Sequence, residues 1–173
     1  MTEKLAAGSA FPVTTVPLVS GGEMTVGGAS ETDRWTLVVI YRGRHCPLCT
    51  KYLATLQEMA GDFDKEGTDV VAISGDGLEK AKEQVSVGSL SIPVGYDLSI
   101  EQMQAMGLYI SNPRSPEETD QPFPEPGLFV LRPDGTLQII DISNAPFSRP
   151  DLPAILRGIT FGRDKGYPVR GTY

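Results

Sequence analysis

The chain has 173 residues, of which 40% are hydrophobic and 21% are charged, and its formal net charge at pH 7 is −7. The composition excludes a disordered chain, and the length predicts one domain over residues 1–173. The negative net charge argues against nucleic acid as a partner, because acidic surfaces repel phosphates. Since no apolar run approaches the roughly 20 residues of a spanning helix and no signal-peptide pattern opens the chain, we expect a cytoplasmic protein without membrane partners.

The first third of the chain predicts an irregular segment, a buried strand and a helix. Residues 1–33 are rich in Gly, Ser, Thr and Pro, with a hairpin expected across the Gly21-Gly22 pair. Residues 35–41 (WTLVVIY) are a continuous β-branched and aromatic run, typical of a central strand buried on both faces. A helix is predicted next because apolar residues recur every three or four positions, at Leu48, Tyr52, Leu56, Met59 and Phe63.

The rest of the chain alternates between strand and helix patterns. The elements predicted after Gly67 are a strand over 68–74, a helix over 78–87, a strand over 93–96, a helix over 99–106, antiparallel strands over 127–132 and 137–142, and a helix over 151–161. Strand, helix and strand in succession predict a parallel pair with a right-handed crossover. The order of elements therefore indicates an α/β protein.

A proline-rich segment interrupts this pattern. Residues 111–126 (SNPRSPEETDQPFPEP) hold five prolines in sixteen residues, which predicts an irregular surface loop. Loops of this length in compact domains are often functional. We expect it to lie beside the active site and to shape substrate access, although a surface insertion without function is an alternative.

The segment His45-Cys46-Pro47-Leu48-Cys49 carries the two cysteines of the chain and its one histidine. A structural zinc site usually needs four Cys or His ligands, so this composition argues against a metal. Chance placement would not explain why both cysteines fall between a buried strand and an amphipathic helix. A redox-active dithiol is the hypothesis that accounts for their position.

The predicted helix start gives this hypothesis a physical mechanism. Because Pro47 suits a first helical turn, Cys46 should cap the helix, where free backbone amides and the helix dipole favour a thiolate. We expect Cys46 to be the exposed nucleophile of low pKa and Cys49, on the same face, its buried partner. Arg44 and His45 would add positive or hydrogen-bonding character beside the sulfur, or would simply be solvated loop residues. We favour His45 as a residue that tunes the redox centre.

These residues resemble the thioredoxin superfamily, and within it the peroxiredoxin-like branch related to alkyl hydroperoxide reductase and thiol-specific antioxidant. The resemblance rests on the strand followed by YRGRHCPLC and on the later PGLFVLRPDG. It implies a thioredoxin-type α/β fold with a central mixed sheet and helices on both faces. It also implies that Pro126 is a cis-proline facing the cysteines, unless Pro126 is only a rigid loop end.

The chain departs from both groups that it resembles. Peroxiredoxins typically have a proline where this chain has Val39, and a threonine or serine where it has Gly43. Thioredoxins have a buried aspartate at the position of Ile40. The resemblance therefore leaves two enzyme activities open, a disulfide oxidoreductase and a hydroperoxide reductase.

In either activity, the Cys46 thiolate attacks a disulfide or a peroxide oxygen, and Cys49 then forms an internal disulfide. Expected partners are protein disulfides or small hydroperoxides, with a thioredoxin- or glutathione-type reductant that restores the dithiol. No metal or organic cofactor is required. The alternative to an enzyme is a non-catalytic redox sensor or binding module. The sequence indicates no oligomeric state.

Overall fold

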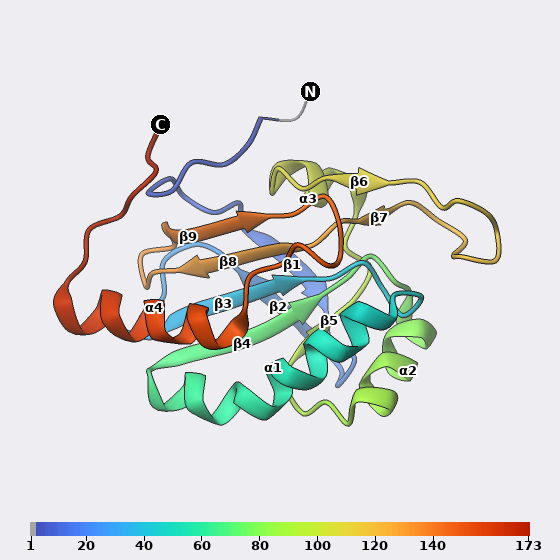
Figure 1. The fold of residues 1–173 in the computed structure, drawn as a ribbon, viewed down its shortest axis with the longest axis horizontal. Coiled ribbons are helices and arrows are strands. Elements are labelled where there is room, and N and C mark those ends of the chain that lie inside the picture. The colour runs from blue at the N-terminus through green and yellow to red at the C-terminus, as the bar shows by residue number, and fades with distance from the viewer. Residues whose placement is uncertain (1–2) are drawn as a thin grey trace.

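A five-stranded mixed sheet organises residues 3–173, the part of the chain that the computed structural model describes (Figure 1). Its strand order is β5 (Val94–Gly95), β4 (Thr68–Ile73), β3 (Trp35–Ile40), β8 (Gly127–Leu131) and β9 (Leu137–Ile142). The first three strands are parallel, whereas β8 runs antiparallel to both of its neighbours. Because β3 and β9 are both antiparallel to β8, the segments that follow them leave the same end of the sheet.

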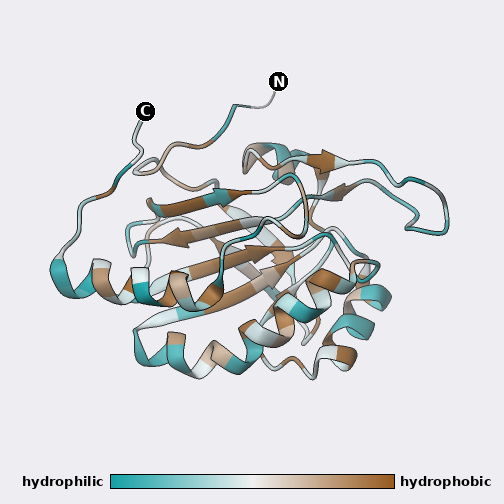
Figure 2. Ribbon diagram, viewed as in Figure 1, coloured by the Kyte–Doolittle hydropathy of each residue, from teal (hydrophilic) through white to brown (hydrophobic). Residues whose placement is uncertain are grey.

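The two faces of β3 enter two separate hydrophobic cores. Leu37 and Val39 pack with α1 (Pro47–Lys65) and α4 (Leu152–Lys165) on one face. Val38 and Ile40 pack on the other face, and all four side chains are buried. Figure 2 shows the corresponding hydrophobic colouring along the central strands. The prediction of a central strand buried on both faces is confirmed.

The coverage of the two faces is unequal. The α1–α4 face also carries α2 (Leu78–Gly88), which contacts α1. The opposite face carries the single short helix α3 (Ile100–Ala105) and an antiparallel hairpin of β1 (Thr14–Pro17) and β2 (Glu23–Val26). This arrangement confirms the thioredoxin-type α/β fold with a mixed sheet, and it confirms the predicted hairpin across Gly21-Gly22.

Two details of the predicted pattern were wrong. Leu48, the first residue of the predicted apolar stripe of α1, is 45% exposed. Leu56 and Phe63 of that stripe are buried, and Cys49 and Leu53 are buried beside them. The proline-rich segment is irregular only in its middle. Its ends pair as β6 (Ile110–Ser111) and β7 (Phe123–Pro124), a two-stranded ladder in which each strand is only two residues long.

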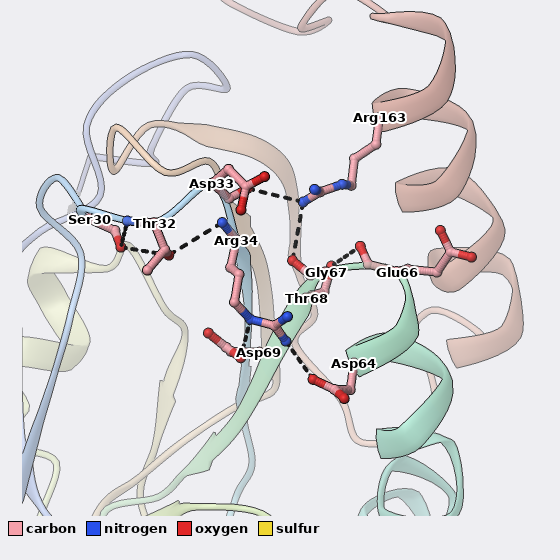
Figure 3. A network of polar contacts seen from close by, with 10 residues as sticks. All are labelled: Ser30, Thr32, Asp33, Arg34, Asp64, Glu66, Gly67, Thr68, Asp69 and Arg163. Atoms are coloured by element: carbon pink, nitrogen blue, oxygen red, sulfur yellow. Dashed lines mark hydrogen bonds and ion pairs between the residues drawn. The ribbon is translucent and has the colours of Figure 1, made fainter.

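A polar network fixes the end of the sheet at which β3 and β4 begin (Figure 3). The Arg34 guanidinium bonds Asp69 at 2.9 Å and Asp64 at 2.7 Å, which ties β3 to β4 and to the end of α1. Arg163 of α4 donates to the carbonyl of Gly67 at 3.1 Å. Gly67 has a φ of +64° in the turn between α1 and β4, a conformation that glycine adopts without strain.

Candidate active site

Cys46 and Cys49 lie where β3 passes into α1, as the sequence predicts. Cys46 is the N-cap of α1 and has extended backbone dihedrals. Its sulfur accepts a hydrogen bond from the backbone N–H of Cys49 at 3.3 Å. Pro47 occupies the first helical turn, where its missing N–H leaves no bond unmade. Both cysteines are free thiols, and Cys49 follows the N-cap Cys46 by three residues, in the first turn of α1.

The pKa values of the two thiols are shifted in opposite directions. The pKa of Cys46 is lowered to about 6, chiefly because the Cys49 thiol and backbone N–H donate to its sulfur, with help from the charges of Arg42 and Arg149. The pKa of Cys49 is raised, because it donates to Cys46 and is buried. At neutral pH this arrangement favours a Cys46 thiolate beside a protonated Cys49, and the thiolate is the reactive form of cysteine.

The expected exposure of Cys46 was wrong. Its exposed fraction is 2%, and that of Cys49 is 0%. The reason is that the side chain of Cys46 turns back to cap α1 and joins the hydrophobic core cluster that contains Cys49 and Leu53. The geometry nevertheless makes Cys46 the more acidic of the two thiols, as expected from its position at the start of the helix.

Two arginines that sequence reasoning missed face the dithiol. Arg42 directly follows β3 and the buried Tyr41, and its guanidinium lies 4.6 Å from the centre of the Phe123 ring. Arg149, between β9 and α4, places its guanidinium 3.5 Å from the sulfur of Cys49. Arg42 could have been identified from the sequence, because it lies a few residues before Cys46. Arg149 is distant in sequence, and only the parallel relation of β3 and β9 brings it to this end of the sheet.

Asp76 occupies the space beside Gly43. The carboxylate accepts a hydrogen bond from the backbone N–H of Arg44 at 2.7 Å, and its burial raises the pKa of Asp76. A Cβ added to Gly43, whose φ is +142°, would lie 2.7 Å from the carboxylate. This contact accounts for glycine at position 43, where the resemblance to peroxiredoxins implies a threonine or serine.

Arg44 and His45 both lie at the edge of the site and are partly buried. Arg44 forms an ion pair with Glu83 at 3.4 Å. The His45 ring packs against Phe123 with 4.6 Å between ring centres. Burial, followed by the charge of Arg42, lowers the pKa of His45, so its ring is neutral at pH 7. That His45 tunes the redox centre stays a prediction.

Pro126 lies at the same end of the sheet but is not a cis-proline. No peptide bond among residues 3–173 is cis. Gly127 pairs with Ile40, which places buried Pro126 next to the start of the cysteine-bearing segment. The carbonyl of Pro126 accepts a hydrogen bond from the backbone N–H of Ser143 at 2.9 Å, which ties Pro126 to the residue that follows β9.

The segment over residues 111–126 is held against the site by charged contacts. Glu125 forms an ion pair with Arg42 at 3.3 Å, and Glu118 lies 3.8 Å from the same guanidinium. Lys80 of α2 contacts Asp120 near the turn of the segment. The expected position beside the active site is confirmed by these contacts, whereas its role in substrate access stays a prediction.

The described residues contain no group of three or more His, Cys, Asp or Glu side chains arranged to hold a metal ion. Within residues 3–173, none of the helices has the length and apolar character needed to cross a lipid bilayer.

Two free cysteines at the start of the first long helix of a thioredoxin-type fold are typical of thiol-dependent redox proteins. The AhpC/TSA family matches residues 7–140, which is more than half of the chain, so this chain belongs to the AhpC/TSA family. It is a peroxiredoxin-like, thiol-dependent oxidoreductase.

Individual relatives agree with this assignment. A protein of Mycobacterium tuberculosis (strain CDC 1551 / Oshkosh) named "Putative peroxiredoxin MT2597" is 31% identical over 108 residues, covering 62% of this chain and 68% of the relative. A "1-Cys peroxiredoxin" of Medicago truncatula is 26% identical over 131 residues, covering 73% of this chain and 59% of the relative. The crystal structure of a peroxiredoxin-like protein from Aquifex aeolicus has the same fold, with a TM-score of 0.76 at 18% identity and coverage of 91% and 87% of the two chains.

Proposed function

We propose that this chain reduces small hydroperoxides with a dithiol centre made of Cys46 and Cys49. The observation that carries the proposal is the N-cap geometry, in which the Cys46 sulfur accepts the N–H of Cys49 at 3.3 Å and has a pKa of about 6. The thiolate attacks one peroxide oxygen, an S–O bond forms as the O–O bond breaks, and the departing alkoxide or hydroxide takes up a proton. Cys46 is then a sulfenic acid.

Cys49 resolves this intermediate in the proposed cycle. Its sulfur attacks the sulfur of Cys46, an S–S bond forms, and the sulfenic oxygen leaves as water after protonation. An external thiol of the thioredoxin or glutathione type then reduces the internal disulfide and restores both thiols. The short separation of the cysteines within one helical turn supports resolution inside one chain.

The burial of Cys46 favours a peroxide over a protein disulfide as the oxidising substrate. A thiol that is 2% exposed can be approached more readily by a small hydroperoxide than by a protein disulfide, which must bring its own backbone close to the attacking sulfur. Disulfide reduction is the second candidate function. It is favoured by the 45% exposure of Leu48 between the cysteines, which gives a partner protein an apolar contact at the motif.

A steady-state assay separates these functions. The protein is supplied with hydrogen peroxide or with insulin as a disulfide substrate, each with thioredoxin and its reductase or with glutathione and its reductase. We expect turnover of peroxide, its loss in Cys46→Ser, and a single oxidation without turnover in Cys49→Ser. Turnover of insulin alone would replace the proposal with disulfide reduction. Stoichiometric oxidation without turnover of either substrate would indicate a redox sensor.

A further inference from the structure

Arg149 is a cation in direct contact with the sulfur of Cys49. Its Nη1 lies 3.5 Å from that sulfur, and Cys49 is fully buried. Arg149 belongs to the connection between β9 and α4, which leaves the sheet at the end where β3 leads into α1 (Figure 1). The contact therefore joins the second cysteine to a segment far away in the sequence.

The guanidinium of Arg149 is held in place by groups close to Cys49. It lies over the ring of Tyr52, 4.4 Å from the ring centre, and its Nε donates to the carbonyl of Pro146 at 2.9 Å. The Tyr52 hydroxyl in turn donates to the carbonyl of Pro150 at 2.8 Å. Tyr52 is one helical turn after Cys49, so these contacts bind the Arg149 segment to the first turns of α1.

No carboxylate of the described residues forms an ion pair with Arg149. Arg42 differs, because Glu125 and Glu118 share its charge. The Arg149 guanidinium is half-buried, has no carboxylate partner among the described residues and contacts a sulfur atom. Such a cation can stabilise an anion that forms on that sulfur.

The resolving step creates a need for such a cation. In the reduced protein, Cys49 stays protonated because it is buried and donates to the Cys46 thiolate. Once Cys46 is a sulfenic acid, its negative charge is gone, and Cys49 must lose its proton to attack. The other groups that face Cys49 are Cys46, the backbone of Arg42 and the buried Tyr41, and none of them supplies a positively charged side chain in contact with the sulfur.

We propose that Arg149, held by Tyr52, stabilises and orients the Cys49 thiolate for its attack on oxidised Cys46. The inference rests on the dithiol mechanism proposed above. In this step, Cys49 releases its proton to solvent, its thiolate forms the S–S bond, and the S–O bond of the sulfenic acid breaks. The electron pair leaves with the oxygen, which is protonated to water.

The first test does not depend on peroxide. The pKa of Cys49 is measured from thiolate absorbance in Cys46→Ser, with and without Arg149→Gln. We expect Arg149→Gln to raise this pKa by about one unit, which is about a tenfold loss of thiolate at a fixed pH below the pKa. Arg149→Lys should restore part of the shift. Arg157→Gln, on the exposed surface of α4, is the matched control and should leave the pKa unchanged. An unchanged Cys49 pKa in a folded Arg149→Gln variant would overturn the inference.

The second test follows the two oxidation steps separately. After one equivalent of hydrogen peroxide, dimedone traps the sulfenic acid while mass spectrometry quantifies the internal disulfide. We expect Arg149→Gln to form the disulfide about tenfold more slowly, with more trapped Cys46 and a pH profile shifted upward by about one unit. Tyr52→Leu should fall between this variant and wild type. Wild-type resolution rates in both variants would contradict the inference, whereas failure of wild-type protein to form any sulfenic acid or disulfide would refute the proposed function itself.

Discussion

The backbone N–H of Cys49 donates to the sulfur of Cys46 at 3.3 Å, so the first cysteine of the motif is the N-cap of the helix that carries the second. A serine or aspartate oxygen commonly fills this position. Here the acceptor is a sulfur atom, and the same bond that begins the helix also stabilises a thiolate. The start of α1 and the reactivity of Cys46 therefore have one physical origin.

Alkylation tests the acidity that follows from this bond. Because the pKa of Cys46 is lowered to about 6, thiolate is the main form at pH 7 and is lost as the pH falls below 6. We expect iodoacetamide to label Cys46 before Cys49, with a rate that reaches half its maximum near pH 6. Peptide mapping by mass spectrometry identifies the labelled residue. Labelling of Cys49 first, or a midpoint near the ordinary value for cysteine, would contradict the assignment.

Arg42 should contribute to this acidity more than His45 does. The guanidinium charge lowers the pKa of Cys46, whereas the imidazole of His45 is neutral at pH 7. We expect Arg42→Gln, combined with Glu125→Gln to avoid a buried unpaired carboxylate, to raise the pKa of Cys46. His45→Phe should change it less and should keep the packing against Phe123. Titration of thiolate absorbance measures both, and a larger shift in His45→Phe would reverse this ranking.

A side chain at position 43 should destabilise the protein, and the loss of stability should depend on Asp76. In Gly43→Thr, the new side chain meets the Asp76 carboxylate on backbone with a φ of +142°, so we expect destabilisation of about 2 kcal/mol or more. Adding Asp76→Ala removes the contact and should recover part of that loss. Urea unfolding of the two single variants and the double variant gives the coupling energy. Strictly additive effects would show that Asp76 does not account for the glycine.

Much of the fold follows from local sequence patterns. The run at 35–41, the helix after Pro47 and the antiparallel strands at 127–132 and 137–142 each have a signal within a few residues, and the structure confirms these elements. Leu48 was misassigned because a spacing of three or four fits two neighbouring stripes of one helix, and only the position of the sheet decides which is buried.

The site was predicted less completely, for a similar reason. Both cysteines and their neighbours Arg44 and His45 form one continuous motif. Arg149, however, reaches Cys49 across a hundred residues of sequence, and Asp76 reaches Gly43 from the end of another strand. These contacts depend on strand order, which single-residue patterns do not specify. Pro126 was located at the correct end of the sheet, but its cis peptide bond was predicted wrongly, because the residues next to a proline do not specify its isomer.

Two glycines, one within α1 and one just after it, should respond in opposite directions to substitution by alanine. Gly67 has a φ of +64°, and a Cβ there would lie 2.9 Å from the Arg163 guanidinium, so Gly67→Ala should destabilise the protein by about 1 kcal/mol or more. Gly61 lies within α1 and a Cβ there meets nothing within 4 Å, so Gly61→Ala should stabilise it by about 0.5–1 kcal/mol. Thermal unfolding compares the two. A stabilising Gly67→Ala would show that the network of Figure 3 is not rigid.

The central claim is that Cys46 and Cys49 form one redox unit that turns over peroxide. Its most direct test is mass spectrometry of the reduced protein after one equivalent of hydrogen peroxide, with peptide mapping of the product. We expect wild type to lose the two thiol hydrogens, with the loss located on one peptide that contains both Cys46 and Cys49, while Cys49→Ser retains a sulfenic acid on Cys46. Unreacted thiols in wild type, or oxidation confined to Cys49, would contradict the account.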